Sequence, residues 1–194
     1  MAKDFLNVIE RALMIGISQE VNSLIDDDAP SVGVTSHIDA YNVYVFGEFP
    51  EVSDLKFPAI VVEHTGSGFE EQFMGQDISM GTTTGTGETY GASYTIHIIV
   101  DQENHIKVKD ANASVTGSKT AAVKDGIYRQ RRLLNWLMLN VANAVMDIDF
   151  DVYEEEDTQV LERHLNSWQS VGFIPDLQWY GASADFTITF TNIR

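Results

Sequence analysis

The chain contains no cysteine, few basic residues and no long apolar run, and each absence excludes a class of protein. Without thiols there is no disulfide, no thiolate nucleophile and no zinc–thiolate site, so packing alone must stabilise the fold. Lysine and arginine number 12 against 29 aspartates and glutamates, and the resulting charge of −17 repels nucleic-acid phosphate on average. No run reaches the ~18 apolar residues that indicate a membrane span.

The N-terminal segment, MAKDFLNVIERALM, lacks the uncharged apolar core and the small-residue cleavage site of a signal peptide. We therefore expect the protein to be made and to reside in a cytoplasm. Its 194 residues suffice for one large domain, and neither a linker nor an internal repeat divides them. We predict a single domain over residues 1–194.

The hydrophobic patterns predict an α+β fold, in which a mainly antiparallel sheet packs against two long helices. One helix is expected over 4–26, where apolar residues recur every four positions, and Gly16 within it indicates close packing. A second helix is expected over 126–146, with Asp125 as its cap. The remaining segments are predicted as strands over 37–46, 59–64, 92–101, 147–152 and 177–193, helical turns over 158–169, and a bulge or break at 181–183.

The stretch from Gly66 to Gly91 separates two of the predicted strands and is too long for an ordinary hairpin turn. Seven of its 26 residues are glycine and five are threonine. Loops longer than about 12–15 residues are usually functional arms or disordered segments. We interpret this stretch as an extended β-hairpin arm with a bendable Gly/Thr tip, whose apolar half offers contacts to a neighbouring chain. The apolar residues concerned are Phe69, Phe73, Met74, Ile78 and Met80.

Charge is distributed unevenly along the chain. Residues 107–132, which include most of a second long polar loop predicted at 102–124, carry +5 and leave −22 for the rest. Residues 147–157, DIDFDVYEEED, hold seven acidic residues and no basic one. These two segments could pair within the chain, could be two solvated faces, or could be complementary patches on neighbouring subunits. The candidate residues are Arg129, Arg131, Arg132, Asp147, Asp149, Asp151, Glu154, Glu155 and Glu156.

No pattern in the chain specifies a reaction, and we predict no catalytic, cofactor-binding or metal-binding residue. The acidic segment fails as an EF-hand loop, because Val152 replaces the required glycine and Thr158 the final glutamate. The glycines of GTTTGTGETYG lack the Lys-Ser/Thr ending of a phosphate-binding loop. His64 and His97 could approach each other across neighbouring strands, but the five histidines show no metal-ligand spacing.

Three blocks of the sequence and a closing strand together resemble a known family. These are DFLNVIERALMIGISQEVNSLI, the strand FPAIVVEH that leads into the arm, the pair YTIHIIVDQ and YRQRRLLNWLMLNVANAV, and the closing strand ADFTITFTNI. In this order they resemble the tail terminator, or tail-completion, proteins of tailed bacteriophages and the related neck proteins. The likeness lies in element order over most of the chain, because that family has no signature residues. The longer arm, the second polar loop and the acidic segment depart from it.

The resemblance implies a virion structural protein that is not an enzyme and needs no cofactor. It implies a ring of copies, typically hexameric, that ends the phage tail tube, joins it to the neck or head, and lines the channel for DNA without binding a specific sequence. The expected partners are the chain itself, the tube and the neck or connector proteins, and the expected location is the virion, with assembly in the host cytoplasm. The alternatives are a head–tail connector or other neck or tube protein, a monomeric binding module with a mobile recognition loop, and a metal-assisted hydrolase using clustered carboxylates.

Overall fold

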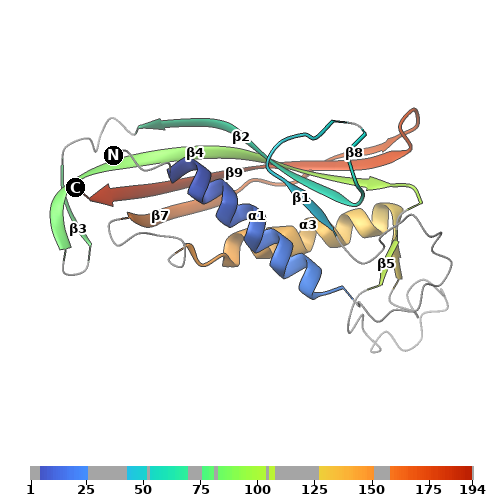
Figure 1. Ribbon diagram of the computed structural model, residues 1–194, viewed down its shortest axis with the longest axis horizontal. Coiled ribbons are helices and arrows are strands. Elements are labelled where there is room, and N and C mark those ends of the chain that lie inside the picture. Colours follow the sequence, from blue (N-terminus) through green and yellow to red (C-terminus); the bar gives the residue numbers. More distant parts are fainter. Residues whose placement is uncertain are drawn as a thin grey trace.

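The computed structural model describes residues 5–25, 43–51, 53–69, 76–80, 83–103, 105–107, 127–150 and 158–193. Over these residues the protein is a mixed α/β structure, mostly sheet, in which two helices lie against an open sheet (Figure 1). The elements are α1 (Phe5–Ser23), β1 (Tyr44–Phe46), β2 (Ala59–Phe69), β3 (Gln76–Met80), β4 (Thr83–Asp101), β5 (His105–Lys107), β6 (Ile127–Arg129), α3 (Gln130–Asp147), β7 (Thr158–Leu165), β8 (Gln169–Ile174) and β9 (Trp179–Ile193).

Two long antiparallel hairpins make up most of the sheet. In the first, β2 and then β3 run along the same side of β4, which returns as one continuous strand. In the second, β7 and then β8 run along one side of β9, which also returns without a break. In each hairpin the first arm is therefore divided into two strands, β2 and β3 or β7 and β8, whereas the second arm is one continuous strand, β4 or β9.

The two returning strands form the centre of the sheet. β4 and β9 pair from Gly87 opposite Ile193 to Asp101 opposite Trp179, which is the whole length of β9. β1 adds a short parallel edge beside β2, and the order across the sheet is β1-β2-β4-β9-β7. A separate two-stranded sheet of β5 and β6 lies near the start of α3 (Figure 1).

Strand alternation gives the sheet an inner face, on the helix side, and an outer face. Successive side chains of a strand point to opposite faces, so every second residue of β4 and β9 faces the helices. Most of the largest fully buried side chains come from these positions and from the helices, and they include Tyr94, Ile96, Ile98, Phe186, Phe190, Leu13, Ile17, Leu133 and Leu134. Burial, followed by the charge of Glu10, raises the pKa of Tyr94 above its ordinary value.

The first helix is confirmed, and the second begins later than expected. Ile9, Leu13, Ile17 and Val21 all lie in the core, as their four-residue spacing predicts. The second helix starts at Gln130 instead of residue 126, because the chain first pairs as strand β6. The predicted cap at Asp125 is wrong, since the N-cap position is Arg129, which makes no side-chain capping bond.

Two other predicted elements adopt a different conformation. Residues 158–165, expected as helical turns, form strand β7 because β9 supplies a pairing partner along their whole length. Residues 147–150 do not form a strand: Asp147 ends α3, and the chain continues without regular pairing. The predicted burial is nevertheless right there, since Ile148 and Phe150 are buried while Asp147 and Asp149 are exposed.

The strand predictions at both ends of the sheet need smaller corrections. The strand expected over 37–46 is observed at 44–46, and residues 26–42 lie outside the described part of the chain. The strand expected over 177–193 starts at Trp179 and runs unbroken through 181–183. The bulge lies instead on its partner β8, between Ser170 and Gly172, where Gly172 has a φ of +78° that favours glycine.

Much of the Gly66–Gly91 stretch is strand and not loop. Residues 66–69 complete β2, and residues 83–91 form the first half of β4, so the Gly/Thr half is not a separate bendable tip. β3 pairs with the start of β4, and this end of the sheet projects beyond the helices (Figure 1).

Of the polar loop at 102–124, residues 105–107 form β5, and residues 108–126 lie outside the described part.

Gly16 is where α1 comes closest to the segment after α3. A Cβ placed on Gly16 would lie 2.5 Å from Cγ1 and 2.7 Å from Cδ1 of Ile148, which is buried. The close packing predicted from the sequence is confirmed, and only a residue without a side chain fits at this crossing.

We predict that Gly16→Ala destabilises the protein by about 1–3 kcal/mol in urea denaturation, because overpacking at Ile148 outweighs the better helix propensity of alanine. The matched control is Gly66→Ala, since a Cβ there meets nothing within 4 Å. In an Ile148→Ala background the same Gly16→Ala change should become neutral or stabilising. Equal losses in both backgrounds would contradict this packing.

Candidate functional site

The residues predicted as an interface separate into those that the structure describes and those that it does not. Phe69, Ile78 and Met80 lie on strands β2 and β3, whose backbone alone is described at these positions. The three arginines cluster where β6 meets α3, and Asp147 and Asp149 lie at the other end of that helix. The remaining candidates lie outside the described residues: Phe73, Met74, Asp151, Glu154, Glu155 and Glu156.

The arginine cluster and the acidic residues at the end of α3 cannot pair within one chain. Sixteen positions separate Arg131 from Asp147 on one helix, which corresponds to roughly 24 Å at 1.5 Å per residue. Pairing of Asp147 and Asp149 with these three arginines of the same copy is therefore excluded, whereas most of the other basic residues of the 107–132 segment lie outside the described part of the chain. No described carboxylate forms a salt bridge with the arginines, and Arg132 instead lies over the ring of Tyr128, 4.7 Å from its centroid.

The C-terminal end of α3 is stabilised by Arg163, which the sequence patterns did not single out. Its Nη1 donates to the carbonyl oxygens of Met146 and Ile148 at 3.0 and 2.7 Å. Its guanidinium also lies over the ring of Phe150, 5.2 Å from the centroid. A cation here complements the negative end of the helix dipole and satisfies carbonyls that have no partner within the helix.

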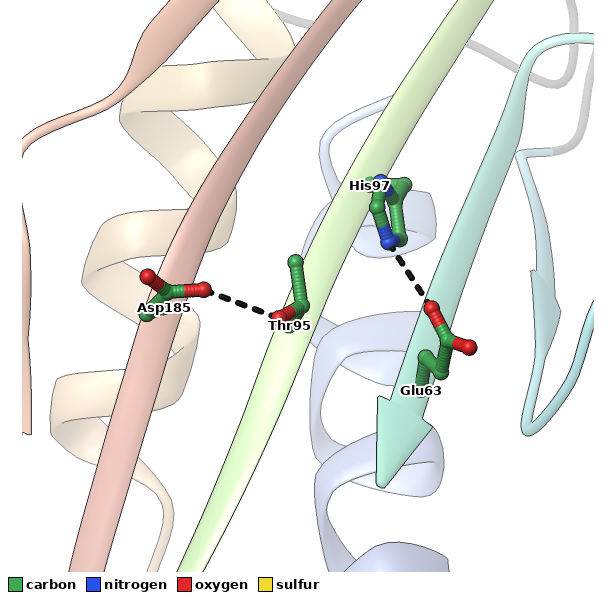
Figure 2. A network of polar contacts seen from close by, with 4 residues as sticks. All are labelled: Glu63, Thr95, His97 and Asp185. Atoms are coloured by element: carbon green, nitrogen blue, oxygen red, sulfur yellow. Dashed lines mark hydrogen bonds and ion pairs between the residues drawn. The ribbon is translucent and has the colours of Figure 1, made fainter. Parts of the chain in front are cut away.

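The outer face of the sheet carries a polar network that spans three strands (Figure 2). Nε2 of His97 on β4 lies 3.2 Å from Oε2 of Glu63 on β2, and the hydroxyl of Thr95 donates to Oδ1 of Asp185 on β9 at 2.8 Å. Figure 2 looks onto this face, with the helices behind the strands. The contacts are exposed to solvent, so each contributes little to stability.

The predicted approach of His64 to His97 is wrong. His64 pairs with Tyr94 and therefore shares the inner face, with its ring 5.2 Å from that of Tyr94, whereas His97 lies on the outer face. Ser183 sits opposite His97 across β4 and β9, yet no hydrogen bond between described residues joins them. In the described part of the chain, the His97–Glu63 pair therefore has no hydrogen-bonded serine beside it that could act as a nucleophile.

Next to this network the outer face contains an apolar pocket of about 220 Å³. It lies between the segment after β1 and the β8–β9 turn, and His97 and Ser183 are its polar residues. The pocket is lined by Phe49, His97, Ile98, Ile99, Val171, Ile174, Leu177, Trp179, Gly181, Ala182 and Ser183. The ring of Phe49 lies 5.0 Å from that of His97, which joins the pocket to the polar network.

The walls of the pocket are unusually exposed for apolar side chains. Phe49, Val171 and Leu177 are 49%, 66% and 50% accessible, whereas the floor residue Ile99 is 9% accessible. The bulge in β8 and the turn that follows carry two of these walls outward from the sheet. Such a cluster of exposed apolar side chains indicates an interaction surface.

Within the described ranges, no group of three or more histidine, aspartate or glutamate side chains is placed to hold a metal ion. Among those same residues, no helix has the length and apolar character needed to cross a bilayer. The arrangement offers an apolar recess beside the polar His97–Glu63 contact.

The chain matches no protein-family model, and no curated protein sequence is significantly similar to it.

Replacing Arg163 tests its role at the end of α3. Arg163→Gln should lower the free energy of unfolding by about 1–2 kcal/mol, because it removes charge-assisted bonds to two helix carbonyls. Arg163→Lys, which keeps the charge without the planar fork, should lose less. Arg11→Gln on the exposed side of α1 is the control and should stay within about 0.5 kcal/mol of the parent. Equal effects of the two glutamine variants in urea denaturation would exclude this role.

Proposed function

We propose that this chain is a structural protein of a phage virion, whose copies form a ring that ends the tail tube and joins it to the neck or head. The single observation that carries the proposal is the arrangement of the elements. A first helix, a long hairpin, a second helix and a second long hairpin follow one another, and both helices cover the same face of one antiparallel centre (Figure 1). This is the plan that the resemblance to tail terminators implies.

The surface of the chain supports assembly over catalysis. The outer face presents exposed apolar walls around a recess, and neither the His97–Glu63 pair nor any other described cluster assembles a nucleophile or metal site. The start of α3 holds exposed cations in a chain whose total charge is −17. Complementary patches of this kind set partner choice and register between protein surfaces.

In the proposed ring, which the resemblance implies to be hexameric, the projecting β3–β4 end is an extended hairpin arm that reaches a neighbouring copy. Before Gly87, the described residues of β4 pair with β3 on one side and have no pairing with β9 on the other, because β9 pairs with β4 only from Gly87 onward. The large negative charge suits a channel through which DNA passes without binding. The location that follows is the tail or neck of the virion.

A binding module that acts as a monomer is the second candidate, and the apolar pocket of about 220 Å³ favours it. The two candidates differ in whether the isolated chain associates with itself. In both, the chain acts by recognition and needs no cofactor.

We predict that the purified chain forms closed rings in negative-stain images at micromolar to millimolar concentration, with a mass by light scattering that is a multiple of the monomer.

Deleting residues 76–86, which removes the projecting end but not the β4–β9 pairing, should preserve the circular dichroism spectrum and reduce ring yield. A strictly monomeric chain that also fails to appear in labelled tail or neck particles would contradict the ring. Unchanged ring yield after the deletion would contradict the arm.

A further inference from the structure

Several carboxylates adjoin the pocket-lining residues in the sequence or on the outer face of the sheet. Glu48 and Glu51 flank the Phe49 wall, and Asp176 immediately precedes the Leu177 wall. Glu63 is bonded to the rim residue His97, and Asp101 continues the outer-face row of β4 beyond Ile99. Lys56, in the segment that follows Glu51, has its ammonium 5.3 Å from the centroid of the Tyr44 ring. An apolar recess within an acidic rim selects an apolar side chain flanked by cations.

The chain itself carries exposed apolar side chains on α3, on the same side of the helix as one arginine. Arg131, Asn135, Leu139 and Asn143 are exposed and recur every four residues, so they form one stripe along the helix, with Met146 at its end. Leu139 and Met146 are 62% and 44% accessible, although the opposite side of the same helix is fully buried. The stripe therefore presents Leu139 two turns after Arg131, at roughly 12 Å along the helix axis, and Met146 at the other end of the helix, beside Asp147.

The two surfaces lie on opposite sides of the molecule. The pocket opens on the outer face of the sheet, and α3 packs against the inner face (Figure 1). They cannot meet within one copy, but the α3 side of one copy can meet the outer face of the next. A contact between two different patches is heterologous, and repeating it generates a ring when the rotation between copies closes.

We infer that the pocket receives the exposed stripe of α3 from a second copy, with Leu139 inserted between Phe49 and Leu177 and Arg131 next to the acidic rim. This inference rests on the proposed ring and names one of its subunit contacts. A small molecule is a poorer occupant, because sites for such ligands enclose most of the ligand, whereas the pocket walls here are themselves half exposed.

The absence of cysteine allows a direct test by site-specific cross-linking. One preparation carries Leu139→Cys and a second carries Leu177→Cys, and each is purified as the full chain. When they are mixed and treated with a short bis-maleimide, cross-linked dimers should form at least about tenfold more than in either preparation alone. The control pair replaces Leu139→Cys with Leu161→Cys, because Leu161 is a similarly exposed leucine, 55% accessible, on β7.

A second set of variants tests the contact without a cross-linker. Leu139→Asp should weaken self-association in sedimentation by about tenfold or more, since it removes the apolar anchor and places an anion at the acidic rim. Leu161→Asp should change it less than about twofold, and circular dichroism checks that both variants fold. Rings that form normally with Leu139→Asp, together with cross-linking no higher than in the control pair, would overturn this contact and leave the ring intact. A chain without self-association or cross-linking at any concentration would overturn both.

Discussion

The pairing of β4 with β9 is the interaction on which the rest of the structure depends. It joins the returning strands of two hairpins along the full length of β9, although the two segments are about eighty to a hundred residues apart in the sequence. Every other strand of the main sheet attaches to this pair, directly or through β2. The inner face of the pair supplies Tyr94, Ile96 and Phe186 to the core cluster that residues of both helices share. Without this pairing neither the core nor a continuous outer face exists.

Because of this pairing, the two faces of the sheet have different surroundings: helices cover one face, and the other is open to solvent. Helices cover much of the inner face, whereas the outer face and the outward sides of the helices carry exposed side chains. Both surfaces carry exposed apolar residues, and their charges are of opposite sign, acidic around the pocket and basic at Arg131. In the proposed ring, two such surfaces on opposite sides of one chain allow a heterologous contact between neighbouring copies.

Local patterns could predict the helices and the buried faces, because these depend on residues three to four or two positions apart. The spacing of Ile9, Leu13 and Ile17 is an example, and Gly16 revealed the close crossing. Residues 83–91 were misjudged, since glycine and threonine near a turn indicate a loop unless a distant strand such as β9 pairs with them. Residues 158–165 became a strand for the same reason. The pocket could not be predicted, because Phe49, His97 and Leu177 meet only in the folded chain.

Amide hydrogen exchange on the isolated chain tests most directly whether the two hairpins form one continuous central pair. The structure predicts that residues 83–91 are protected to within about tenfold of residues 92–101, since both halves belong to the single strand β4 and residues 87–101 pair with β9. Exchange of residues 83–91 at the rate of unprotected amides, while residues 92–101 remain protected, would show that the long strand ends near Gly91 and would contradict the account.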